Sequence, residues 1–175
     1  ENTLAALACA WAVGLPLSEV RERIASFTPV PLRSQIVQCD GLTILNDCYN
    51  ANPLSFARAL EALRDLQVRR TVAIVGDMLE LGPYAPSAHQ AIGRMATQLG
   101  IDAVIAVGAF ADDVAQGVRE GRPSGVTTCR TVQELIGRLP ALLQRGDGLL
   151  VKGSRKLNLE QVTEFLVSRY PGAQG

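Results

Sequence analysis

Short apolar runs alternate with amphipathic stretches along most of the chain, from residue 36 to residue 167. Runs of four or five apolar residues are typical of buried strands, and stretches with a period near 3.6 are typical of helices. The pattern predicts strands at Val72–Val75, Ala103–Val107, Val126–Thr128 and Leu149–Lys152. It predicts helices at about 52–66, 87–99, 109–118, from 131 onward, and 157–167.

Turn and cap residues support these boundaries. Asp40-Gly41 lies between the mostly apolar segments 36–37 and 42–45 and predicts a β-hairpin. Asn52 and Pro53 are typical of an N-cap and a first helical position. Thr131, with Glu134 three residues later, predicts a capping box.

The first thirty residues follow a different pattern. A helix is predicted from Asn2 to Val13 and a second from Ser18, as N-cap, to Phe27. Two prolines in Thr28–Ser34 predict a hinge. Because two helices alone cannot bury both apolar faces, we expect residues 1–33 to belong to a domain whose larger part lies upstream.

The rest of the chain, residues 34–175, predicts one α/β domain. Strands separated by helices indicate a Rossmann-like, mostly parallel sheet with helices on both faces. The helices before it are then a remnant of an upstream domain. The carboxyl ends of parallel strands are where such sheets bind ligands.

The composition of the chain argues against several classes of function. Hydrophobic residues make up 47% of the chain, and 17 basic side chains balance 17 acidic ones. This excludes disorder and disfavours nucleic-acid binding. The longest apolar stretch is about half the ~20 residues that a membrane span needs, and no leader pattern opens the chain, so we expect a cytoplasmic protein. Four cysteines without a Cys-x-x-Cys pair, and one histidine, predict reduced thiols and no metal site.

Three loops at strand ends carry the unusual polar residues. In the first, 46–53, Asp47 is suited to ribose hydroxyls or magnesium, and Tyr49 and Asn50 to a base or sugar. Asn52 is better explained as a helix cap. In the second loop, 76–82, Asp77 and Glu80 are candidate site residues. The alternative interpretation is a loop whose glycines allow its conformation and whose acids are only solvated.

The third loop, 151–156, follows the last predicted strand. Lys152, Ser154 and Arg155 suit an anionic substrate, against a solvated basic turn. His89 is predicted at the surface of a helix. Arg33, in the hinge, could reach a phosphate or form an interdomain ion pair.

Neither common phosphate-binding motif occurs, since the chain has no Gly-x-Gly-x-x-Gly and no Gly-x-x-x-x-Gly-Lys-Ser/Thr. If this chain handles a nucleoside triphosphate, it completes a site that is built elsewhere.

Four segments in order, 46–53, 76–82, His89 and 150–155, resemble the Mur ligase family. The resemblance covers the whole chain. Two positions depart from it: Leu32 stands before Arg33 where glycine is usual, and Cys48 stands where serine or threonine is common. The missing glycine bears on the conformation of the hinge.

The resemblance implies a three-domain, ATP-dependent amide ligase. Residues 1–33 would end the central ATPase domain, and 34–175 would form the C-terminal domain. It implies ATP contacts for Asn2, Arg33, Asp47, Tyr49 and Asn50, and substrate contacts for Lys152, Ser154 and Arg155. Supporting roles would fall to Asp77, Glu80 and His89.

The implied partners are the upstream domains, a UDP-N-acetylmuramoyl-tripeptide and D-alanyl-D-alanine, with Mg²⁺ bound mainly by the central domain. No catalytic set is complete in this chain, so we expect no turnover by it alone. Two other classes remain open. A phospho-receiver would use Asp47, Asp77 and Lys152 at strand ends, but it needs a second acid beside Asp47. A non-catalytic Rossmann-like domain would only bind a small molecule.

Overall fold

The computed structural model describes residues 2–26, 30–121 and 125–171. The chain divides into two compact units, residues 1–30 and 31–175. The first unit contains α1 (Asn2–Ala12) and α2 (Leu17–Ala25). Gly14, with φ +77°, follows α1 as predicted. The prediction of Ser18 as N-cap is wrong: Pro16 holds that position without a side-chain cap bond, and Ser18 lies in the first turn.

The second unit is built on a six-stranded sheet. Its strands are β1 (Gln35–Cys39), β2 (Leu42–Asp47), β3 (Arg70–Gly76), β4 (Ala103–Val107), β5 (Val126–Cys129) and β6 (Asp147–Lys152). The order across the sheet is β1-β2-β6-β3-β4-β5. Among the strands that the structure describes, only the β1–β2 pair, the predicted hairpin, is antiparallel. The predicted α/β class with a mostly parallel sheet is confirmed.

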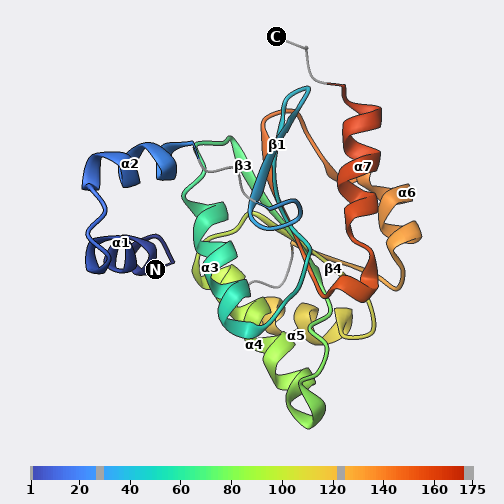
Figure 1. The fold of residues 1–175 in the computed structure, drawn as a ribbon. Coiled ribbons are helices and arrows are strands. Elements are labelled where there is room, and N and C mark those ends of the chain that lie inside the picture. The colour runs from blue at the N-terminus through green and yellow to red at the C-terminus, as the bar shows by residue number, and fades with distance from the viewer. Residues whose placement is uncertain (1, 27–29, 122–124, 172–175) are drawn as a thin grey trace. The chain divides into compact units, whose positions relative to one another are not determined.

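Helices cover both faces of this sheet (Figure 1). One face packs under α3 (Pro53–Arg64), α4 (Ala85–Gln98) and α5 (Ala111–Gly121), and the other under α6 (Val132–Leu142) and α7 (Glu160–Arg169). Alternate residues of β3 enter the two cores: Ala73 and Val75 face one, and Val72 and Ile74 the other. This two-faced burial explains why the strands are apolar runs rather than alternating patterns.

Two predicted cap residues, Asn52 and Thr131, are confirmed. Asn52 accepts a hydrogen bond from the Ser55 backbone N–H at 2.8 Å and completes a capping box with the Ser55 side chain. Thr131 caps α6 by accepting from the Glu134 N–H at 3.1 Å, but the Glu134 carboxylate accepts from the Arg130 N–H at 2.7 Å, so the capping box predicted there is incomplete. The last helix was predicted as continuous from residue 157, but a 3₁₀ turn, η2 (Arg155–Leu157), precedes α7 and ends at the left-handed Asn158.

The carboxyl ends of the parallel strands lie along one edge of the sheet, as predicted. Asp47 at the end of β2 is the register partner of Lys152 on β6, and Lys152 is also the partner of Val75 on β3. Beyond this register, a Cβ on Gly153 would lie 3.0 Å from the Gly76 Cα and 2.6 Å from a Leu159 methyl. Glycine is favoured there because any side chain would force the Gly76 backbone and the Leu159 side chain to shift.

Candidate functional site

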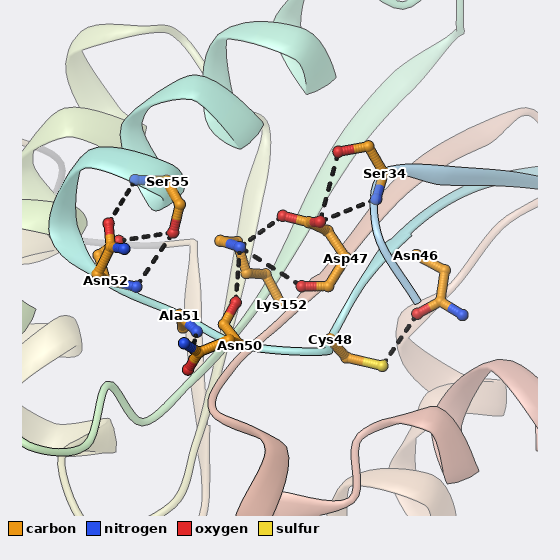
Figure 2. A network of polar contacts seen from close by, with 9 residues as sticks. All are labelled: Ser34, Asn46, Asp47, Cys48, Asn50, Ala51, Asn52, Ser55 and Lys152. Atoms are coloured by element: carbon orange, nitrogen blue, oxygen red, sulfur yellow. Dashed lines mark hydrogen bonds and ion pairs between the residues drawn. The ribbon is translucent and has the colours of Figure 1, made fainter. Parts of the chain in front are cut away.

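An ion pair joins the ends of β2 and β6 (Figure 2). The Lys152 Nζ lies 2.5 Å from the Asp47 Oδ2, and it also donates to the Asn50 carbonyl at 3.0 Å and the Asp47 carbonyl at 3.4 Å. Lys152 is buried, with 1% of its surface exposed, and its Nζ stands 5.5 Å from the centre of the Phe56 ring. A lysine so buried needs a counter-charge, and Asp47 supplies it.

The second carboxylate oxygen of Asp47 binds Ser34, near the start of the second unit. Asp47 Oδ1 accepts from the Ser34 backbone N–H at 2.8 Å and from its hydroxyl at 3.4 Å (Figure 2). Ser34 and Leu32 both adopt left-handed backbone conformations, with φ +47° and +65°. Each is unfavourable for a residue with a side chain, so the Asp47 bonds stabilise an otherwise costly turn around Arg33.

Arg33 lies on an aromatic ring at this turn. Its guanidinium carbon is 4.1 Å from the centre of the Tyr49 ring, and the Tyr49 N–H donates to the Leu32 carbonyl at 3.1 Å. Both side chains are exposed to solvent. The stacking limits the rotamers of Arg33 without using its hydrogen-bond donors, and no other residue in the described ranges accepts from them, so they suit an anion.

A neutral thiol lies behind this surface. Cys48 is fully buried and donates to the Asn46 Oδ1 at 3.1 Å (Figure 2). Burial, followed by the negative charge of Glu160, raises the pKa of the Cys48 thiol to about 11. The thiol is therefore a neutral hydrogen-bond donor and is not a nucleophile at neutral pH.

The loop after β3 uses its side chains differently. Asp77, 6% exposed, accepts from the Ala109 and Phe110 N–H groups at 2.9 and 3.0 Å. The Ser154 Oγ accepts from the Leu79 N–H at 2.9 Å, and the Ser154 N–H donates to the Asp77 carbonyl at 2.8 Å. These bonds tie the loops after β3, β4 and β6 to one another.

The same loop buries the histidine. His89 is fully buried, so the predicted surface position is wrong. Its Nε2 accepts from the Met78 N–H at 2.8 Å, its Nδ1 lies 2.6 Å from the Ala85 carbonyl, and its ring stacks on Phe110 with centroids 4.5 Å apart. An accepting Nε2 requires the proton on Nδ1, so these two contacts fix a neutral imidazole.

Two predicted residues stay at the surface. Arg155 is half-exposed and pairs with Glu160 at the start of α7. Glu80 is exposed, with a left-handed φ of +66°. Glu160 was not predicted, because a glutamate in the first turn of a helix is ordinary and nothing nearby in sequence marks it as a partner.

A cleft of about 340 Å³ opens at the same edge of the sheet. The ends of β4 and β5, the first turn of α6 and the segment from η2 to α7 line it. Arg130 stands at this cleft and pairs with the exposed Asp112 at 2.6 Å. The cleft is adjacent to the loops that carry Asp77 and Ser154, because Asp77 also lines it.

Two absences hold for the residues that the structure describes. No three His, Cys, Asp or Glu side chains among them gather closely enough to hold a metal ion. None of the described helices is long and apolar enough to cross a membrane.

A family model described as "Mur ligase, glutamate ligase domain" matches residues 32–155. The chain belongs to the Mur ligase family. The matched range begins at Leu32 and ends at Arg155, and so includes both the Arg33 turn and the loop after β6.

Members of this family give the finer comparison. The chain is 37% identical over 167 residues to the UDP-N-acetylmuramoyl-tripeptide–D-alanyl-D-alanine ligase of Treponema pallidum, covering 95% of the chain and 36% of that relative. It is 35% identical over 170 residues to the Escherichia coli enzyme of the same name, covering 94% of the chain and 36% of the relative. A crystal structure of MurF from Acinetobacter baumannii matches 95% of the chain and 36% of its own length, with a TM-score of 0.84 and 27% identity.

The segments that resemble Mur ligases thus lie at one edge of the sheet, but the sequence does not predict how their side chains group. Arg33, Asp47, Tyr49, Asn50 and Lys152 lie together. Asp77, His89 and Ser154 form a separate group, while Arg155 and Glu80 belong to neither. Asn2 begins α1, but its side chain lies outside the described part of the structure. Ser34 was missed, since its only signal is its place after Arg33.

Proposed function

We propose that this chain is the C-terminal part of an ATP-dependent ligase that adds D-alanyl-D-alanine to a UDP-N-acetylmuramoyl-tripeptide, the last cytoplasmic step of peptidoglycan precursor assembly. The chain spans 36% of the length of the relatives that carry this name. The proposal therefore assigns ATP phosphate binding and Mg²⁺ to upstream domains, and residues 1–33 to the end of the central domain. The family membership and this coverage support it.

The observation that carries the proposal is the Arg33 turn. An exposed guanidinium rests on the Tyr49 ring, and the Asp47–Ser34 bonds hold the turn at the ligand-binding edge of a parallel sheet. A cation held in place, with free donors, suits the phosphates of ATP that is bound by another domain. Tyr49 would then offer its exposed edge, and Asn50 its side-chain amide, to the nucleoside.

The proposed reaction has two steps. The terminal carboxylate of the tripeptide attacks the γ-phosphorus of ATP, giving an acyl phosphate and ADP. The amine of D-alanyl-D-alanine then attacks the acyl carbon, the amide forms, the amine loses a proton and inorganic phosphate leaves. Mg²⁺ would neutralise phosphate charge in the first step. The hinge contributes Arg33, which would neutralise part of that charge, and the C-terminal domain would shield the acyl phosphate from water.

Among the predicted substrate-binding residues, Arg155 is the one with an exposed charge. Its guanidinium pairs with Glu160 through one nitrogen, which leaves further donors for a substrate carboxylate. The Ser154 hydroxyl instead accepts from the Leu79 backbone and faces inward. We therefore assign carboxylate binding to Arg155 and the shape of the neighbouring loop to Ser154.

The test is phosphate release by the full-length ligase with ATP, Mg²⁺, UDP-N-acetylmuramoyl-tripeptide and D-alanyl-D-alanine, leaving out one component at a time. Release should require all four. Arg33→Ala should lower kcat/KM for ATP about 100-fold, the size expected when one charged contact to a transition state is lost. Arg145→Ala is the matched control, because Arg145 is an exposed, ion-paired arginine at the opposite edge of the sheet. Release that ignores the dipeptide would contradict the proposed acceptor.

A further inference from the structure

Two series of contacts, or arms, start at the Lys152 ammonium group, and both lead to Arg33. One arm runs from the Lys152 ammonium through Asp47 to Ser34, directly after Arg33. The other runs from the ammonium to the Asn50 carbonyl, next to Tyr49, whose ring carries the Arg33 guanidinium. Figure 2 shows both arms meeting at the lysine.

The ammonium group has no capacity left for a ligand. It has three hydrogens, and the Asp47 Oδ2, the Asp47 carbonyl and the Asn50 carbonyl are three acceptors for them. The Phe56 ring lies 5.5 Å from the nitrogen, and 1% of the residue is exposed. A substrate could reach Lys152 only if these contacts were broken.

The turn that the network holds does not form easily by itself. Leu32 and Ser34, on either side of Arg33, are both left-handed without being glycine. Hydrogen bonds from Ser34 to Asp47 and from Tyr49 to Leu32 fix the two sides. Without its lysine, Asp47 would be a partly buried carboxylate that turns towards water and away from Ser34.

We propose that Lys152 is a positioning residue for the ATP site, which acts through Asp47 and Asn50 to hold Arg33 in place, and not a residue that contacts the peptide substrate. This rests on the proposed function, since it takes Arg33 to be the ATP contact. It predicts that removing the ammonium weakens the use of ATP and spares the use of the dipeptide.

The experiment compares Lys152→Met with Lys156→Met in the full-length ligase. Lys156 is the other lysine of this chain and is exposed. Lys152→Met should raise KM for ATP at least tenfold and leave KM for D-alanyl-D-alanine within twofold, while Lys156→Met changes neither. A rise in KM for the dipeptide or the UDP-tripeptide instead would overturn the proposal. So would a lower melting temperature with every KM at its wild-type value.

A double variant separates the lysine from a general folding defect. Lys152→Met/Asp47→Asn removes both charges and leaves no buried ion unpaired. Its KM for ATP should lie within about threefold of that of Asp47→Asn, because Lys152 acts mainly through the ion pair with Asp47 and the hydrogen bond to the Asn50 carbonyl adds a smaller contribution. A further tenfold rise would show an independent role and overturn the proposal. Wild-type enzyme without dipeptide-dependent phosphate release would overturn the proposed function itself, and this inference with it.

Discussion

Two loops at the same edge of the sheet, both predicted to bind ligands, use their polar side chains in opposite ways. Around the loop after β3, Asp77 of the loop and His89 of α4 accept from backbone N–H groups and are buried. Around the loop after β2, Asp47 at the end of β2 and Lys152 at the end of β6 bind each other, and the residues that they hold, Arg33 and Tyr49, are exposed.

This difference distinguishes residues that stabilise the fold from residues that could bind a ligand. A buried carboxylate whose two oxygens both accept from backbone N–H groups, like Asp77, has little left to offer a ligand. The buried Lys152–Asp47 ion pair instead holds an exposed cation, Arg33, in a position to bind a ligand. Substitutions after β3 should therefore act on stability, and substitutions after β2 on ATP use.

The largest effect is expected at Asp77. Asp77→Ala leaves the N–H groups of Ala109 and Phe110 without their acceptors, and unfolding should become easier by about 3 kcal/mol. Urea unfolding of the chain measures this. Glu80→Ala, an exposed acid in the same loop, is the control and should stay within about 0.5 kcal/mol. Equal effects at both positions would contradict the scaffold role of Asp77.

For Cys48, which follows β2, we expect a pH-dependent contribution of about 2 kcal/mol to the free energy of unfolding. Its pKa is about 11 when folded, against an ordinary value of 9.0, so the folded state keeps a proton that the unfolded state releases. The stabilisation is complete below pH 9 and is lost as the pH rises towards 11.

Melting curves of the wild type and of Cys48→Ser, recorded from pH 8 to pH 11, measure this contribution. The difference between the two proteins should shrink as the pH rises, because a serine hydroxyl does not titrate in this range. A constant difference would mean that the Cys48 thiol reaches solvent.

The smallest effect is expected from backbone strain, which can be compared at one residue of each region. Leu32 and Glu80 have nearly the same φ, +65° and +66°. At each position the glycine variant should be more stable than the alanine variant by about 1 kcal/mol, since only glycine adopts this conformation freely. Thermal unfolding of the four variants checks this, and an alanine variant as stable as its glycine partner would show that the turn relaxes.

The local features were predictable because they depend on neighbours in sequence. The hairpin at Asp40-Gly41, the Asn52 cap and the strand order along the chain all follow from short patterns, and the structure has them. Ser18 failed because Leu17 and Pro16 already start the helix. Leu32 keeps the left-handed backbone that the usual glycine predicts, and it packs against the core, which offsets part of the strain.

The site was less predictable because its contacts are distant in sequence. Nothing local shows that Lys152 lies beside Asp47, since that depends on β6 entering the sheet between β2 and β3. The burial of His89 depends on Met78 and Phe110, which reach it from other elements. Sequence patterns therefore located an edge of the sheet where polar residues gather, and tertiary contacts decide which of those residues remain exposed.

The position of β6 also sets the order in which the domain can be completed. It follows the other five described strands in the chain, yet it lies between β2 and β3 and is the only parallel partner of β2 among the described strands. Until it emerges, the β1–β2 hairpin and the β3–β4–β5 portion have no strand to join them. The candidate ligand-binding edge thus forms only after β6 has been synthesised, and we expect a chain that stops before residue 147 to leave these two parts of the sheet unjoined.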